Sequence, residues 1–206
     1  MKNNSQQKET PQKSFWQYIR KNGLSIVFGA GVVVMIASPD AKSWVLKQIM
    51  LTGIFNAHID DKSAGKSFEK VADFKFKDEG GRKANISSLE GKVVFINVWA
   101  SWCPPCRAEF PSIMSLYDKY KTDPNVYFLM VNEDENVSAA KAFLEKEHYP
   151  FPIFKIDGII PSGVYSGTLP TTVVLDKKSR IRYHHEGFAN YGSKKFIKEI
   201  EAIVNE

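Results

Sequence analysis

The apolar residues of this chain change their spacing twice between the amino and carboxyl termini. Residues 24–37 form an uncharged apolar run, and residues 44–55 space their apolar side chains as one face of a helix. Beyond about residue 67, short strand-like runs alternate with helical patterns. This alternation predicts an α/β domain over residues 67–206, preceded by an apolar segment at 23–39 and by an amphipathic helix and polar linker at 40–66.

Six strands and three helices are expected within the α/β domain. Residues 93–99 are almost continuously apolar, as expected for a central strand that is covered on both faces. The other expected strands are 71–77, 126–131, 152–156, 171–175 and 181–185, the last two joined by a turn at 176–180. The expected helices are 105–120, kinked at Pro111, 138–147, and 196–204 with Ser193 as its N-cap. The pattern predicts a mixed sheet with helices on both faces.

The positive charge of the chain is concentrated at its amino terminus. Residues 1–23 carry +4 of the net charge of +5, which leaves the remainder of the 206 residues almost neutral. A polar, basic tail at 1–22, of which 1–14 are expected to be disordered, followed by an apolar run is typical of a membrane topology signal with a cytoplasmic amino terminus. The near-neutral remainder disfavours nucleic acid as a partner.

The apolar segment at 23–39 has two interpretations, an uncleaved single-pass anchor in the inner membrane or a cleaved signal peptide. Its uncharged run of about 14 residues spans about 21 Å as a helix, against about 30 Å for a bilayer core, which favours a signal peptide. Residues 35–39 form a poor cleavage site, which favours the anchor. Either way, residues 40–206 are expected outside the cytoplasm. The helix at 44–55 is expected to lie on the outer membrane surface or to dock on the domain.

The two cysteines, Cys103 and Cys106, lie where the central strand meets the next helix. Two cysteines this close in sequence do not form the kind of disulfide that stabilises exported domains. At a helix amino terminus, unpaired N–H groups and the dipole stabilise a thiolate, so we expect Cys103 to be the nucleophile and the more buried Cys106 to resolve the mixed disulfide. A zinc site needs four ligands, and the adjacent His184 and His185 should point to opposite faces of a strand. Redox chemistry without a metal or other cofactor is therefore favoured over zinc or inert thiols.

Two segments resemble those of a known family. Residues 98–111, VWASWCPPCRAEFP, are similar to the active-site segment of TlpA/ResA-like thioredoxin-fold proteins, and residues 167–176 to their cis-proline segment. The resemblance covers about residues 67–206, with both motifs in the family's order. It implies a thioredoxin-like fold on a membrane tether and reduction of disulfides in exported, extracytoplasmic or periplasmic proteins, often during cytochrome c maturation. It also implies an integral-membrane thiol carrier of the DsbD or CcdA type as electron donor.

The resemblance assigns the residues that contact clients. Pro170, by itself an ordinary loop proline, is expected to follow a cis bond and to leave the backbone of Leu169 free to pair with a client strand, with Thr168 also in contact. Trp102, Pro104 and Pro105 are also expected on the client-binding surface. Trp99, by contrast, is expected in the core.

Glu109 and Asn97 are the candidates for proton chemistry. Glu109 follows Cys106 by three residues and shares its helix face. Most glutamates at such a position are solvated, but the family pattern has a glutamate here, which implies proton transfer to or from Cys106. Asn97 stands where ordinary thioredoxins carry a buried aspartate. Since an amide cannot accept that proton, Glu109 is the expected substitute.

The cysteine motif leaves the direction of the reaction open. The same dithiol can act as a reductase or as a thiol oxidase, because the reduction potential and the available partner decide the direction. A thiol peroxidase is disfavoured, since it uses a single peroxidatic cysteine in a different turn. A client-binding or chaperone module without turnover is the alternative from another class, and the presence of both cysteines argues against it.

Overall fold

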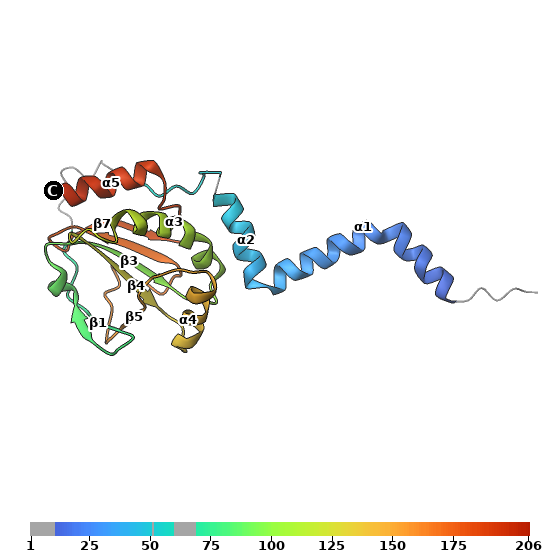
Figure 1. The fold of residues 1–206 in the computed structure, drawn as a ribbon, viewed down its shortest axis with the longest axis horizontal. Helices are drawn as coiled ribbons and strands as arrows, with labels where there is room; N and C mark the ends of the chain where they lie inside the picture. Colours follow the sequence, from blue (N-terminus) through green and yellow to red (C-terminus); the bar gives the residue numbers. More distant parts are fainter. Residues whose placement is uncertain (1–10, 51, 60–68) are drawn as a thin grey trace, which may run out of the picture. The chain divides into compact units, whose positions relative to one another are not determined.

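The computed structural model describes residues 11–50, 52–59 and 69–206, with side chains from residue 21 onward (Figure 1). The predicted tail at 1–10 and the predicted linker at 60–66 lie outside the described residues. The chain divides into two compact units, Met1–Ala41 and Lys42–Glu206.

The first unit holds helix α1, Pro11–Ala37. The prediction of a disordered tail through residue 14 is wrong at residues 11–14, because the helix begins upstream of the apolar run. Apolar side chains of this helix, including Leu24 and Phe28, are exposed. Within the described residues, no single helix is both long and apolar enough to cross a bilayer, and only the bent pair Lys21–Ala37 and Pro39–Met50 meets that requirement when taken together.

Helix α2, Pro39–Met50, ends before the boundary expected from the apolar pattern, and residues 52–55 form a turn. Within the second unit it is docked on the domain, since Met50 is buried and Lys47 Nζ donates to Glu147 Oε2 at 3.3 Å. Trp44 on the same helix is 62% exposed. The structure therefore confirms the docked interpretation, while contact with a membrane surface stays a prediction.

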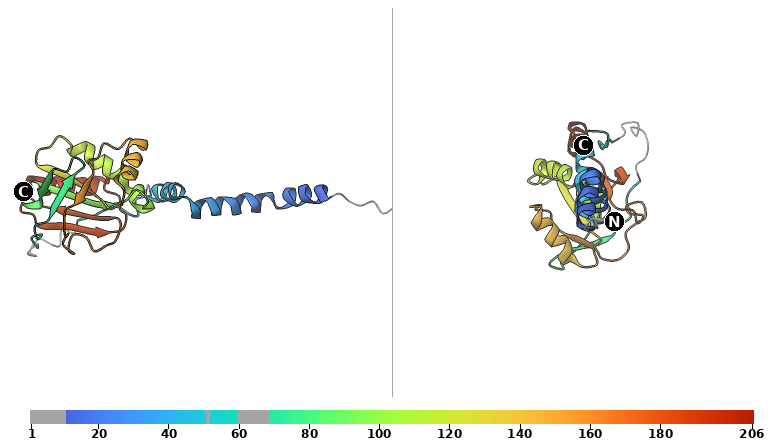
Figure 2. Two further views of the ribbon diagram at one scale, coloured as in Figure 1. Left: turned by 90° about the horizontal axis from the view of Figure 1, so that it is seen from below. Right: turned by 90° about the vertical axis from the view of Figure 1, so that its right-hand side faces the viewer.

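A seven-stranded mixed sheet forms the centre of the second unit (Figures 1 and 2). Its strands are β1 (Lys75–Asp78), β2 (Lys83–Asn85), β3 (Val93–Trp99), β4 (Val126–Asn132), β5 (Phe154–Ile156), β6 (Thr171–Leu175) and β7 (Ile181–Glu186). They lie in the order β2-β1-β5-β4-β3-β6-β7. The strands β3, β4 and β5 are parallel to one another, and all other neighbours are antiparallel. The carboxyl ends of three parallel strands therefore meet at one edge, and the loop from β3 starts there.

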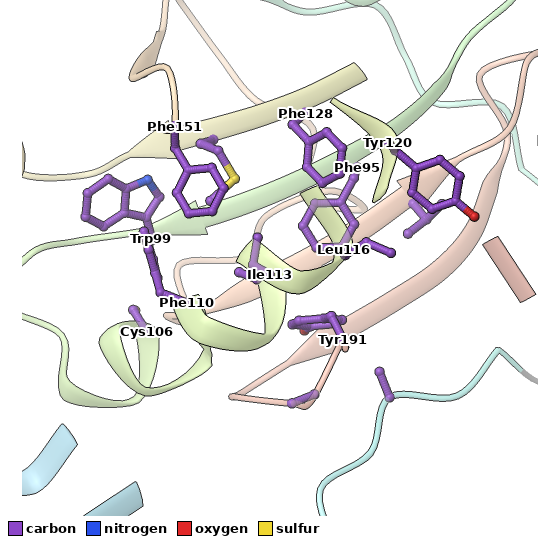
Figure 3. Packing of buried hydrophobic residues seen from close by; sticks show 14 of the residues in the cluster. Phe95, Trp99, Cys106, Phe110, Ile113, Leu116, Tyr120, Phe128, Phe151 and Tyr191 are labelled. Carbon is purple, nitrogen blue, oxygen red and sulfur yellow. The ribbon is translucent and has the colours of Figure 1, made fainter. Parts of the chain in front are cut away.

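Two hydrophobic clusters cover the two faces of the sheet. Alternate residues of β3 serve them, with Phe95 and Trp99 in one cluster and Ile96 and Val98 in the other. The helices α3 (Pro104–Tyr120), α4 (Val137–Lys146) and α5 (Lys194–Asn205) all contribute to the first cluster, which Figure 3 shows between α3 and the sheet. The second face is covered by the short 3₁₀ helix η2 (Ile86–Leu89) and irregular segments. Among the described residues, α-helices thus pack on one face of the sheet, and on the other face the expected helical cover is the 3₁₀ helix η2 alone.

Most predicted elements agree with the structure within two residues, but the first strand does not. β1 begins at Lys75 rather than at residue 71, because the backbone before it pairs elsewhere: Val71 N donates to Ser179 O at 2.9 Å. β2 was not predicted, since its three residues have no apolar alternation. The cap of α5 is as predicted, with Ser193 Oγ accepting from Phe196 N at 3.2 Å.

Candidate active site

The two cysteines lie at the first turn of α3, directly after the loop that follows β3. Cys103 is the N-cap of the helix, and Pro104 and Pro105 occupy its first positions, where a missing N–H breaks no helical hydrogen bond. Cys103 and Cys106 form a disulfide with their Cα atoms 5.3 Å apart. Cys106 N donates to Cys103 Sγ at 3.2 Å. The helix amino terminus therefore supplies an N–H to the sulfur that we expect to carry the thiolate.

Exposure differs little between the two cysteines. Cys106 is fully buried and Cys103 is 3% exposed, which agrees with the predicted order. Trp102, directly before Cys103 in the chain, is 61% exposed, whereas Trp99 is fully buried, both as predicted. Pro104 and Pro105 are half-buried beside the pair.

The peptide bond between Leu169 and Pro170 is cis, as predicted. Thr171 pairs with Val98 on β3, so the proline lies at the strand end from which the cysteine loop starts. Leu169 is half-buried and packs against the cluster that includes both cysteines, while Thr168 is exposed. The structure thus brings the two motifs to one edge of the sheet. Contact of Thr168, Leu169, Trp102 or the prolines with a client stays a prediction.

Glu109 is fully buried, so the interpretation of a solvated surface glutamate is wrong. Its Oε1 accepts from Asn97 Nδ2 at 2.7 Å, and its Oε2 accepts from Ala189 N at 3.4 Å. Burial raises the pKa of the Glu109 carboxyl well above its usual range, and the two hydrogen bonds oppose this only in part. A carboxyl that holds its proton at higher pH than usual therefore lies one helical turn from Cys106.

Asn97 connects this carboxyl to the cis-proline strand. Its Nδ2 donates to Thr172 Oγ1 at 2.9 Å as well as to Glu109, and its Oδ1 has no hydrogen-bond partner among the described residues. Two buried phenols, Tyr183 and Tyr191, also surround the carboxyl. Burial raises the pKa of both phenols, and the charge of Glu109 raises it further.

Sequence reasoning missed a second carboxylate at the site. Asp134, just beyond the end of β4, accepts from Ser101 N at 2.9 Å and from Ser101 Oγ at 2.8 Å. Polar residues just beyond the end of a buried parallel strand are a sequence signal for this edge of the sheet, and that signal could have identified Asp134. Across the described ranges, no group of three or more histidine, cysteine, aspartate or glutamate side chains gathers as metal ligands.

Comparison with known proteins places the chain among thiol-disulfide enzymes. Residues 64–198 match the model of the Redoxin family. The thiol-disulfide oxidoreductase ResA of a Bacillus cereus strain is 33% identical over 129 residues, which cover 62% of this chain and 74% of the relative. ResA of Bacillus subtilis (strain 168) is 29% identical over 129 residues, covering 62% of this chain and 72% of the relative.

Solved structures show the same fold. A putative thiol:disulfide interchange protein DsbE from Chlorobium tepidum is 28% identical, with a TM-score of 0.57 over 68% of this chain and 98% of its own. A putative thioredoxin from Neisseria meningitidis is 25% identical, with a TM-score of 0.55 over 68% of this chain and 93% of its own. The predicted thioredoxin-like mixed sheet with flanking helices is therefore confirmed.

Proposed function

The chain belongs to the Redoxin family and is a thiol–disulfide oxidoreductase, and on this premise we propose that it reduces disulfides in exported proteins outside the cytoplasm. One observation carries the proposal: the Cys103–Cys106 disulfide lies at the start of α3, one turn from a fully buried Glu109. The dithiol exchanges electrons by itself, so the reaction needs no other cofactor.

The reaction proceeds in two exchanges from the reduced enzyme. The Cys103 thiolate attacks one sulfur of the client disulfide, a bond to Cys103 forms, and the other client sulfur leaves as a thiolate. Cys106 then loses its proton and attacks Cys103, which releases the second client sulfur as a thiolate. The two client thiolates take up two protons, the client is reduced, and the enzyme is left with the Cys103–Cys106 disulfide.

Glu109 serves the second exchange as the group that takes the proton from Cys106. Asn97 supports this role of Glu109, because its side-chain amide can donate to the ionised carboxylate or, when turned over, accept from the protonated carboxyl. In the structure, Nδ2 donates to the carboxylate at 2.7 Å. When Glu109 is protonated, the turned amide presents Oδ1, which has no partner among the described residues, to the carboxyl hydrogen, and Thr172 Oγ1 can donate to the same oxygen. An aspartate in place of Asn97 would repel the carboxylate instead.

The surroundings of the cysteines favour the reductase over the oxidase. A strong oxidase stabilises its thiolate, which makes its reduced form favourable. Here Cys103 Sγ accepts a hydrogen bond from Cys106 N, but the buried Glu109 carboxyl, one turn further along α3, adds a negative charge near the cysteines whenever it is ionised. The guanidinium of Arg107 lies over the Phe143 ring, 4.8 Å from its centroid. A negative charge near the dithiol disfavours the thiolate, which favours a reducing dithiol.

The amino-terminal charge pattern supports the proposed location. A +4 segment before an apolar helix keeps the amino terminus in the cytoplasm and the domain outside, tethered to the inner membrane. Such a reductase must be recharged, and an integral-membrane thiol carrier of the DsbD or CcdA type is the proposed donor. Apocytochrome c, which must have free thiols to receive haem, belongs to the proposed class of clients.

The reduction potential of the dithiol tests the direction. The full chain is equilibrated with dithiothreitol buffers, and the Cys103–Cys106 redox state is read by alkylation and mass. A potential of about −200 mV or lower, the range of glutaredoxins and thioredoxin, is expected. A value near about −120 mV, as for DsbA, would support the oxidase instead. Failure to reduce insulin, despite a dithiol that cycles, would support the non-catalytic binding module.

A further inference from the structure

Asp134 is a buried carboxylate that no step of the proposed reaction uses. It is 3% exposed and lies two residues beyond the end of β4, at the edge of the sheet from which the cysteine loop starts. Oδ2 accepts from Ser101 N at 2.9 Å and Oδ1 accepts from Ser101 Oγ at 2.8 Å. Ser101 precedes Cys103 by two residues, so both oxygens of the carboxylate hold the loop that carries the nucleophile.

The same residue joins the ends of three adjacent strands. Asn132 Nδ2 donates to Asp134 Oδ2 at 2.6 Å, and Asp134 N donates back to Asn132 Oδ1 at 3.2 Å. Lys155, on β5, donates its Nζ to the Asp134 carbonyl. Glu133 N donates to Trp99 O at 2.8 Å, which continues the pairing of β4 with β3 up to the loop. Asp134 therefore fixes the loop relative to strands that cannot move independently.

Burying a carboxylate is costly unless its lone pairs are used, and an apolar residue of similar size is often as good for stability. All the side-chain hydrogen bonds of Asp134 in the described structure serve Ser101 and its own strand end. We propose that Asp134 is a positioning residue, which holds the 100–103 loop so that Cys103 Sγ and the exposed Trp102 face an incoming client disulfide.

This proposal rests on the proposed disulfide reduction, and Asp73, an exposed aspartate with similar hydrogen-bond partners, provides a control. Asp73 makes nearly the same contacts with Ser87 and Asn85: it accepts from Ser87 N at 2.8 Å, from Ser87 Oγ at 3.2 Å and from Asn85 Nδ2 at 2.8 Å. Those partners lie at β2 and η2, away from the cysteine loop. Asp134→Asn and Asp73→Asn therefore weaken similar hydrogen bonds, the first at a buried site on the cysteine loop and the second at an exposed site away from it.

Insulin reduction by the full chain gives the first readout. Asp134→Asn should lower kcat/KM at least about tenfold, since a hydrogen bond to a charged acceptor is lost from a loop that must orient its sulfur, while Asp73→Asn should stay within about twofold of the wild type. Alkylation of reduced Cys103 by iodoacetamide above its pKa needs no such orientation and should stay within about twofold in both variants. Equal kcat/KM values for the two variants would overturn the proposal. A wild type that does not reduce insulin would instead overturn the proposed function.

Coupling to Ser101 distinguishes positioning from a general loss of structure. Ser101→Ala should lower kcat/KM about threefold, and Ser101→Thr, which keeps the hydroxyl, should restore it. The double variant of Ser101→Ala and Asp134→Asn should be no more than about twofold worse than Asp134→Asn alone. Amide hydrogen exchange of Ser101 should be about tenfold faster in Asp134→Asn and unchanged in Asp73→Asn. Independent, multiplicative effects or unchanged Ser101 exchange would refute the role. If Asp134→Asn does not fold, the Ser101 pair decides alone.

Discussion

Replacing Glu109 with glutamine should change how the stability of the domain depends on pH. Burial raises the pKa of this fully buried carboxyl well above the ordinary value of 4.5. Because the folded state then holds the proton more tightly than the unfolded state, the stability that protonated Glu109 contributes is complete below pH 4.5. It is lost progressively as the pH rises toward the folded pKa.

The size of the effect follows from the contacts of the carboxyl. In the window above pH 4.5, the free energy of unfolding of the wild type falls by about 1.4 kcal/mol per pH unit through Glu109 alone. Glutamine has no such slope. When its oxygen accepts from Asn97 Nδ2, its NH₂ faces Ala189 N, another donor, in place of the carboxylate oxygen that accepts there at 3.4 Å. The lost hydrogen bond costs about 1 kcal/mol. Glu109→Gln should therefore be less stable than the wild type at pH 4.5 and below, and more stable than the wild type from about one pH unit above 4.5.

Urea unfolding of the oxidised full chain in mild detergent at a series of pH values from 4 to 8 measures this directly. Tryptophan fluorescence is a suitable probe because Trp99 is fully buried in the core beside the site. Glu145→Gln changes the same atoms at an exposed position of α4 and should keep the wild-type slope. Parallel curves for Glu109→Gln and the wild type would show that Glu109 titrates like an exposed carboxyl, and the proposed proton chemistry would fail with it.

Further predictions concern topology, the core, a helix cap and catalysis. A reporter such as alkaline phosphatase fused after Glu206 should be active, since it works only outside the cytoplasm; an inactive fusion would overturn the location. Phe110→Ala should lower the free energy of unfolding by about 3–5 kcal/mol in urea, because the buried ring packs edge-on against Trp99 at 4.8 Å between centroids. Ser193→Ala should lower it by about 1 kcal/mol, through loss of the cap on Phe196 N, and no change would remove Ser193 as a cap. Glu109→Gln should slow insulin reduction and shift its pH profile, and a wild-type rate and profile would exclude proton transfer.

The sheet centre could be predicted from the chain because burial on both faces leaves a simple pattern. All seven residues of β3 are buried, and the nearly continuous apolar run marks its ends correctly. The start of β1 could not be found in this way. The pattern of residues 71–77 is similar to that of a half-buried strand, but Val71 and Phe74 pack under the second face while Val71 N donates to Ser179 O, far along the chain. Tertiary packing therefore decides what the local pattern leaves ambiguous.

The sequence predicts those site residues that lie within one short motif, but not those whose position depends on contacts between several elements. Cys103, Cys106 and Pro170 follow from two short motifs. The burial of Glu109 depends on Asn97 and Ala189, which belong to other elements, so helical spacing alone favoured a solvated side chain. Asp134 and Ser101 are 33 residues apart, and the parallel register that pairs Trp99 with Asn132 brings them together. Such contacts depend on strand register, which a single sequence does not specify.

Trapping of mixed disulfides tests most directly the claim that Cys103 attacks and Cys106 resolves. The full chain as the Cys106→Ala or the Cys103→Ala variant is reduced, mixed with oxidised insulin and quenched with acid, and the products are separated without reductant. Cys106→Ala should accumulate a covalent adduct to insulin, because the first exchange occurs and the second cannot. Cys103→Ala should accumulate none, because the fully buried Cys106 cannot begin the reaction. An adduct with Cys103→Ala, or none with Cys106→Ala, would contradict the assignment.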